Sequence, residues 1–172
     1  EMESRGDLKV RVALYPKVPH VCTLEYAMSG TIKDRFAKAD PERLMLGGMK
    51  MFIDGGLTSK AAAMHEPYWG TDQRGDLSFE PEQFKEIVGK LHGAGYQIAV
   101  HAIGDLAQDV VLDAYEALPS RKGENGAQHR IEHAGNCLWT DERAARFVAL
   151  DVLPVPQPSS SSGPPACSAR PR

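Results

Sequence analysis

The sequence predicts an α/β protein whose strands run parallel. Short apolar segments bounded by turn residues suit buried strands, and longer segments carry apolar residues at helical spacing. The two kinds of segment alternate at least three times along the chain. Such alternation favours parallel strands joined by right-handed crossovers.

The first half of the chain predicts two strands separated by a weak helical region. Residues 8–15 alternate apolar with polar or small side chains and end at a proline, which is typical of a strand. A weaker helical pattern lies within residues 21–38. Residues 49–53 are a short apolar run closed by an Asp-Gly-Gly turn, so a second strand is predicted there, followed by a long loop to about residue 78.

The second half predicts three helices, each followed by a strand. In chain order these are a helix from Pro81, a strand at residues 96–101, a helix at residues 107–118, a strand at residues 130–133, a helix after Thr140 and a strand near Val152. Pro81 suits a first helical turn because its φ is fixed, and Thr140 suits a helix cap because its hydroxyl accepts a backbone N–H. Residues 1–158 are thus predicted to form one domain. Residues 159–172, rich in serine and proline without apolar periodicity, are predicted to be a disordered tail.

Composition excludes several classes of protein. Of the 172 residues, 42% are hydrophobic and 25% are charged, which is the profile of a globular domain. The net charge is −3 and no basic stripe is interleaved with aromatic residues, so no nucleic-acid partner is expected. No segment approaches the roughly 20 apolar residues that span a bilayer, so no membrane partner is expected either. Three cysteines without Cys-x-x-Cys spacing favour a reducing, cytoplasmic setting.

Two histidines stand at the ends of successive predicted strands. His101 ends one strand and His133 the next, and each precedes a loop that leads into a helix. The carboxyl ends of parallel strands meet at one face of an α/β barrel, so these imidazoles are expected to converge. Imidazole is a common ligand of zinc. A histidine that merely bonds a neighbouring loop is the competing interpretation of each.

Strand alternation predicts which residues share a face with these histidines. His101 shares its face with Ala99, whereas Ile98 and Val100 point to the helices. In the earlier strand, Lys50 is expected to point to the inner face, although an ordinary surface lysine is the alternative.

The same rule, applied to the shorter strand, groups His133 with Ile131 and His129 on the inner face. Arg130 and Glu132 are then expected on the helix side, where two charges fit badly unless they pair.

Other polar residues are candidates for the second shell of a site or for its substrate loop. Asp54 and Asp105 follow strands and could orient ligands or, equally, start turns and cap helices. The remaining candidates are Lys60 and Tyr68 in the long loop, and His129 before the shorter strand. Simple loop packing is an equally good interpretation of Tyr68, and a loop role is favoured for His129.

Three sequence blocks, taken together, resemble a known family. The blocks Lys-Met-Phe-Ile-Asp-Gly at residues 50–55, His-Ala-Ile-Gly-Asp at residues 101–105 and Arg-Ile-Glu-His-Ala at residues 130–134 are similar to the amidohydrolase superfamily, in particular its YtcJ-like branch, amidohydrolase family 3. The resemblance covers about residues 8–158. It implies a partial (β/α)8 TIM barrel of the metal-dependent hydrolase type, comprising roughly strands 3 to 7, since a complete barrel needs about 250 residues.

The resemblance also implies a ligand set for zinc or another divalent metal, with one or two ions. Lys50 matches the family's carboxylated lysine, His101 its ligand on the fifth strand and His133 its ligand on the sixth. The family's His-x-His pair and late aspartate have no counterpart, so the general base is unassigned and the chain resembles a fragment. The loop at residues 54–60 also departs from the family's Asp-Gly-Ser-Leu-Gly-Ser-Arg, which leaves its substrate contacts open.

The expected function is hydrolysis of C–N bonds of amide type in non-peptide small molecules by a metal-activated water. The alternatives are a catalytically inactive truncated fragment and a binding module without enzymatic activity. A small-molecule substrate is the expected partner, while the substrate's identity and the oligomeric state stay open.

Overall fold

The computed structural model describes residues 6–135 and 138–157. Its strands are β1 (Val12–Leu14), β2 (Leu44–Leu46), β3 (Met49–Phe52), β4 (Ile98–His101), β5 (Arg130–Glu132) and β6 (Leu153–Val155). Its helices are α1 (Leu24–Met28), α2 (Thr31–Phe36), α3 (Pro81–Gly93), α4 (Asp105–Glu116) and α5 (Asp141–Ala149). The predicted tail at residues 159–172 lies outside the described residues.

Every strand pairing between these elements is parallel, as the sequence predicts. β3, β4, β5 and β6 form one sheet in chain order, and β1 pairs with β2. The β1–β2 ladder continues beyond its last pair, because Lys17 pairs in parallel with Lys50 of β3. The strands therefore lie side by side in sequence order. β2 and β3 follow each other along the same line of the array, between β1 and β4.

The break between β2 and β3 is caused by two glycines that the sequence pattern did not separate from the strand. A Cβ at Gly47 would overlap the ring of Tyr15, and a Cβ at Gly48 would overlap the backbone carbonyl of Gln97. Only glycine allows the neighbouring strands to approach so closely at this point. The strand predicted at residues 8–15 is likewise shorter in the structure, since β1 starts only at Val12.

Helices α3 and α5 begin where the sequence predicts, for the expected local reasons, whereas α4 begins two residues before the predicted helix at residues 107–118. Pro81 occupies the first turn of α3. The Thr140 hydroxyl accepts the backbone N–H of Arg143 and caps α5. The weak helical pattern in the first half corresponds to two short helices, α1 and α2, rather than to one.

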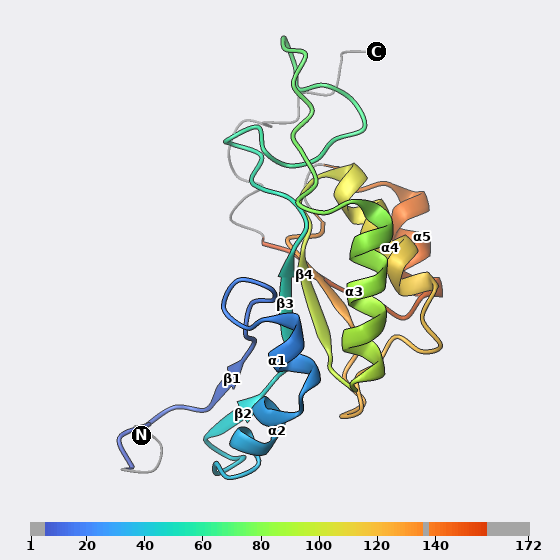
Figure 1. Cartoon of the computed structure of the whole chain (residues 1–172). Helices are drawn as coiled ribbons and strands as arrows, with labels where there is room; N and C mark the ends of the chain where they lie inside the picture. The colour runs from blue at the N-terminus through green and yellow to red at the C-terminus, as the bar shows by residue number, and fades with distance from the viewer. Residues whose placement is uncertain (1–5, 136–137, 158–172) are drawn as a thin grey trace.

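Helices α3, α4 and α5 cover one face of the sheet, and the long loop after β3 extends beyond the carboxyl ends of β3 and β4 (Figure 1). The hydrophobic core lies between the sheet and these helices. It includes Met49 and Met51 of β3, Ile98 and Val100 of β4, and Ile131 of β5, all fully buried. The other face of the sheet is left for polar side chains.

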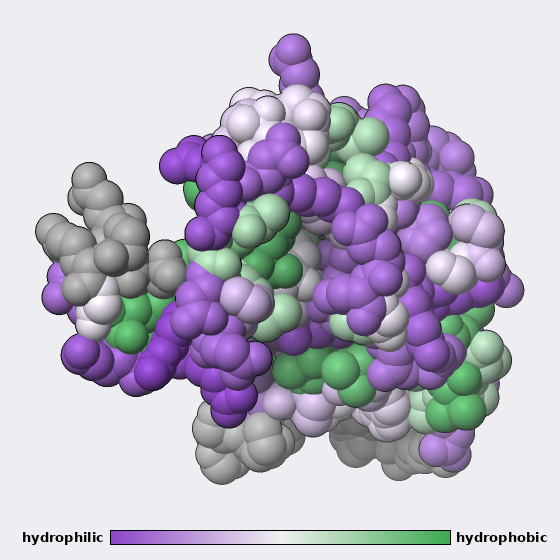
Figure 2. Space-filling view, turned by 90° about the horizontal axis from the view of Figure 1, so that it is seen from below, coloured by the Kyte–Doolittle hydropathy of each residue, from purple (hydrophilic) through white to green (hydrophobic). Residues whose placement is uncertain are grey.

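Apolar side chains remain exposed near both edges of the strand array. Leu14 and Met45 are exposed in β1 and β2, and Leu153 is exposed in β6. Seen from below, the surface shows hydrophobic patches between hydrophilic side chains (Figure 2). The architecture is α/β and corresponds to part of a (β/α) barrel whose sheet is open within the described residues.

Candidate metal centre

Strand register brings the candidate residues onto the face of the sheet that the helices do not cover. Lys50 is in register with Ala99, and Ala99 with Arg130. One pair further along, Phe52 is in register with His101, and His101 with Glu132. Neighbours in register point to the same side of a sheet, so these side chains form two adjacent rows.

The ring of His101 is held on several sides. It stacks on Phe52 with the ring centroids 4.7 Å apart and an interplanar angle of 16°. Its Nε2 lies 3.3 Å from the carbonyl oxygen of Gly55 and 3.5 Å from Oδ1 of Asp54. Because both neighbours are acceptors, Nε2 carries the proton and donates, which leaves the lone pair on Nδ1.

Burial also keeps His101 neutral. Desolvation lowers the pKa of its imidazole to about 4, against the opposing effect of the hydrogen bond to Gly55, and His133 and Lys50 lower it further. A neutral imidazole is the form that binds a metal ion. Near pH 7, His101 therefore offers a free ring nitrogen.

His133 reaches the same place through an unusual backbone conformation. Its φ is +68°, a left-handed value that few residues other than glycine adopt. The two histidine rings meet with centroids 4.6 Å apart and an interplanar angle of 70°. Its Nδ1 donates to Oε1 of Gln157 at 2.8 Å, so the lone pair is on Nε2. Backbone strain of this kind is often found at functional sites.

Lys50 is the third candidate ligand near His101 and His133. Its Nζ is buried without a hydrogen-bond partner in the structure and lies 4.8 Å from the centroid of the same Phe52 ring on which His101 stacks. Burial lowers the pKa of its amine to about 8; Glu132 opposes this change, whereas Arg130 and Lys17 add to it. An unpartnered buried amine is costly, which makes Lys50 the polar group here that most needs a further partner.

The prediction of which side chains of β5 point to each face of the sheet is wrong. Arg130 and Glu132 lie on the inner face, where Nε of Arg130 is 2.6 Å from Oε1 of Glu132 and the guanidinium lies 4.4 Å from the centroid of the Tyr15 ring. Ile131 is in the core on the helix side. The rule failed because it extended regular alternation through His133, whose positive φ turns that residue back toward His101.

His129 lies on the helix side and is fully buried, away from any substrate loop. Its Nδ1 accepts the backbone N–H of Ile98 at 3.1 Å, so its Nε2 donates to Nδ1 of His92 in α3 at 3.0 Å. Tyr115 of α4 packs against its ring with centroids 5.2 Å apart. His129 therefore joins the sheet to the helix layer.

The burial of His129 predicts that stability falls in mild acid. In the folded chain, desolvation lowers the pKa of the His129 imidazole from its ordinary 6.5 to about 4, and His92 adds to this shift. The unfolded chain thus binds this proton more readily, and the contribution is full above about pH 6.5 and lost as pH falls toward about 4.

From this shift, the free energy of unfolding in urea should fall by roughly 1 kcal/mol between about pH 7.5 and about pH 5.5. His101 contributes with the same sign and Asp54, whose pKa is raised, with the opposite sign, so a His129→Gln variant is the matched comparison. We expect that variant to show a shallower pH dependence. An identical slope in both proteins would assign the effect to other groups.

The two aspartates fasten the loops around the site. The Asp54 side chain is fully buried and accepts backbone N–H groups from Ala63, Ile103 and Gly104 at 3.1, 3.1 and 2.7 Å. Burial raises its pKa to about 6, although these three hydrogen bonds act in the opposite direction. Asp105 accepts the backbone N–H of His65 at 2.9 Å and stands in the first turn of α4.

The two loop candidates serve different local roles. Lys60 is exposed and has a left-handed φ of +54°, within the turn that follows β3. Tyr68 is buried, and its hydroxyl donates to the carbonyl oxygen of Ala62 at 2.8 Å. In the part of the chain that the structure describes, the local contacts of both residues lie within the loop and not with Lys50, His101 or His133.

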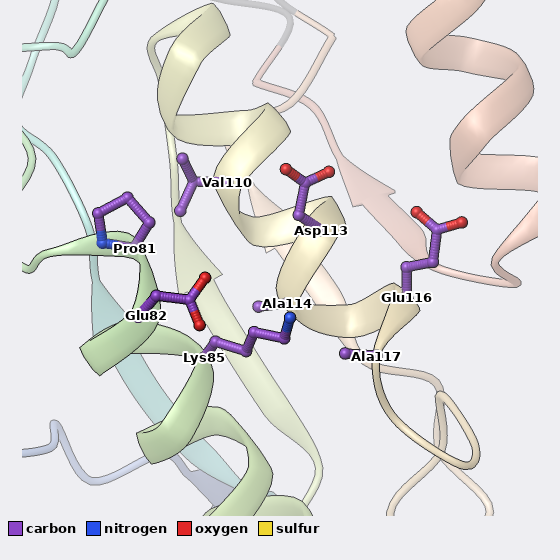
Figure 3. Close-up of a pocket in the computed structure, with 8 residues that line it drawn as sticks. All are labelled: Pro81, Glu82, Lys85, Val110, Asp113, Ala114, Glu116 and Ala117. Atoms are coloured by element: carbon purple, nitrogen blue, oxygen red, sulfur yellow. The ribbon is translucent and has the colours of Figure 1, made fainter.

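The rings of His101 and His133 thus lie against each other with available nitrogens, and the unpartnered amine of Lys50 lies beside the Phe52 ring on which His101 stacks. This arrangement fits part of a divalent metal site. No group of three His, Cys, Asp or Glu residues in the described ranges is arranged to hold a metal ion. A separate pocket lies between α3 and α4, lined by Pro81, Glu82, Lys85, Val110, Asp113, Ala114, Glu116 and Ala117 (Figure 3). It is on the helix layer, so it does not contain the candidate ligands.

Comparison with known proteins identifies the family. The family model of the amidohydrolase family matches residues 1–165, so the chain belongs to the amidohydrolase family. It is 32% identical over 160 residues to YtcJ of Bacillus subtilis, covering 87% of this chain and 30% of that protein. It is 38% identical over 118 residues to the protein LONG AFTER FAR-RED 3 of Arabidopsis thaliana, covering 68% of this chain and 20% of that protein.

The fold matches solved structures as well. The crystal structure of an uncharacterized metal-dependent hydrolase from Pyrococcus horikoshii superposes with a TM-score of 0.72 at 30% identity, covering 91% of this chain and 29% of that one. The chain therefore spans less than a third of the length of these relatives. None of the helices within the described residues has the length and apolar character needed to cross a membrane.

Proposed function

We propose that this chain supplies part of the active site of a metal-dependent hydrolase that cleaves amide-type C–N bonds in non-peptide small molecules. The observation that carries the proposal is the contact between the rings of His101 and His133 at the carboxyl ends of β4 and β5, together with Lys50, which lies one row earlier on the same face beside the Phe52 ring. The family is named for amide hydrolysis, and the solved relative is named as a metal-dependent hydrolase.

His101 and His133 would hold the metal through different ring nitrogens. Hydrogen bonds occupy Nε2 of His101 and Nδ1 of His133, which leaves Nδ1 of the first and Nε2 of the second as donors. Lys50 would contribute as a carbamate, because the lowered pKa raises the fraction of neutral amine near pH 7, and the neutral amine adds carbon dioxide with loss of a proton. Zinc or another divalent ion, when bound, would supply Lewis acidity that activates water and polarises a carbonyl.

Proton transfer needs a carboxylate that these residues do not offer. Asp54 already accepts three backbone N–H groups, and Glu132 is paired with Arg130. Within residues 6–135 and 138–157, neither is placed as a free base beside the two imidazoles. A general base from elsewhere in the barrel is therefore part of the proposal.

The chain by itself should bind zinc weakly and below one ion per chain. Lys50 ligates only as a carbamate, so without that modification the chain offers two imidazoles where a catalytic zinc ion usually has three protein ligands. Metal analysis after dialysis against dilute zinc chloride measures this, with a His101→Ala, His133→Ala double variant as the control. Two tightly held ions per chain would contradict the ligand assignment. Equal uptake by the double variant would favour the alternative of a module that does not use this site.

A further inference from the structure

Asp54 lies close to the ring of His101 as well as to the backbone of the two loops that it fastens. Its two carboxylate oxygens have different surroundings. Oδ2 accepts the N–H groups of Ala63 and Gly104, whereas Oδ1 accepts that of Ile103 and faces Nε2 of His101 at 3.5 Å. One buried carboxylate thus connects the loop after β3, the turn after β4 and the candidate ligand that ends β4.

The close packing around Asp54 leaves its carboxylate little freedom. A Cβ at Gly104 would overlap the backbone of Ala63, and a Cβ at Gly55 would overlap Ala61, so the loop and the turn lie against each other. The His101 ring stacks on the face of Phe52 and makes an edge-to-face contact with the ring of His133. The orientation of the ring about its own axis is then decided by what faces its nitrogens.

We propose that Asp54 is a positioning residue for His101: together with the Gly55 carbonyl, its carboxylate keeps the proton on Nε2 and so directs Nδ1 toward the metal. The inference rests on the proposed function for the role of Nδ1, but the proton position is a property of the metal-free chain. A carboxylate behind a metal-binding histidine fixes the tautomer and raises the basicity of the other nitrogen.

The chain contains a matched control for this role. Asp105 also ties the long loop to the start of α4, because its Oδ1 accepts the backbone N–H groups of His65 and Leu106, both at 2.9 Å, and within residues 6–135 and 138–157 it does not face His101. Asp54→Asn and Asp105→Asn each replace a carboxylate that fastens the loop. Only Asp54→Asn alters the group that faces Nε2 of His101.

The test uses 15N-labelled histidine in the metal-free chain, where imidazole shifts report which nitrogen carries the proton. We expect wild type and Asp105→Asn to show His101 protonated on Nε2, and Asp54→Asn to show a mixture of tautomers. Zinc affinity by titration with zinc chloride should fall about 10- to 100-fold in Asp54→Asn and change little in Asp105→Asn.

Several outcomes would overturn the inference. The first is that His101 in the wild-type chain is protonated on Nδ1. The second is that the Asp54→Asn chain keeps both the wild-type tautomer and the wild-type zinc affinity and loses only stability. If Asp54→Asn does not fold, Asp54→Glu keeps the charge but shifts the carboxylate and should give the same mixture. If His101→Ala binds zinc like wild type, the proposed function fails, whereas the tautomer measurement still decides the role of Asp54.

Discussion

Replacing His101 or His133 with alanine should abolish hydrolysis in a chimaera that joins this chain to the remaining barrel strands of an active relative. Each change removes a ring nitrogen offered to the metal. Changing a residue that only orients a metal ligand typically costs about 10- to 100-fold, so a loss of more than roughly 100-fold in kcat/KM is expected. The fold should survive, which circular dichroism checks. Full activity in either variant would remove that histidine from the site.

Lys50→Ala should be equally inactive in the same chimaera, but it should differ in one respect. A short carboxylic acid added to the buffer can occupy the space that the side chain leaves and replace the carbamate. It cannot replace an imidazole fixed on a strand. Rescue is therefore expected for Lys50→Ala alone. Equal rescue of all three variants would mean that none is a specific ligand, and full activity of Lys50→Ala without acid would leave Lys50 an ordinary lysine.

Replacing Arg143 should have the largest effect on stability. Its guanidinium is buried in α5 and forms two hydrogen bonds to the Asp109 carboxylate, at 3.1 and 3.0 Å, with a third to the carbonyl oxygen of Leu138 at 2.6 Å. Removing one partner of a fully buried ion pair costs about 3–5 kcal/mol. The Asp109 side chain is 28% exposed and also contacts His65, so a smaller loss of roughly 2–3 kcal/mol is expected here. Arg143→Met should lower the free energy of unfolding by that order, as measured in urea.

Arg143→Lys should also be clearly destabilising, since an ammonium cannot reproduce the two-point contact with the carboxylate. Arg146 on the same helix is the matched control. It pairs with Asp113 and Glu116, and at 3.7 Å with Asp109 as well, but is one-third exposed, so Arg146→Lys should cost less than about 1 kcal/mol. Similar losses at the two positions would show that burial of the Arg143 pair does not matter.

Much of the fold follows from local patterns. The runs at Met49, Ile98 and Ile131 are apolar because they lie under helices, and their flanking glycines and prolines mark where elements end. The break at Gly47 and Gly48 was not predictable, because it depends on how closely Tyr15 and Gln97 approach from neighbouring strands. Such contacts are made between distant parts of the chain and leave no periodic signal.

The sequence indicates which residues form the candidate site but not how their side chains are oriented. Strand ends and the family blocks indicated Lys50, His101 and His133. The positive φ of His133 could not be read from the sequence, and it reversed the expected faces of Arg130 and Glu132. His129 was a candidate for the site on sequence grounds, yet its contacts with His92 and Ile98 place it beneath the helices.

The most direct test of the site is which histidine nitrogens respond when zinc chloride is added to the 15N-histidine chain. The chain has six histidines, so four serve as internal references. The account predicts that Nδ1 of His101 and Nε2 of His133 shift together with zinc concentration, while His92 and His129 stay unchanged. A response confined to other histidines, or through Nε2 of His101, would contradict it.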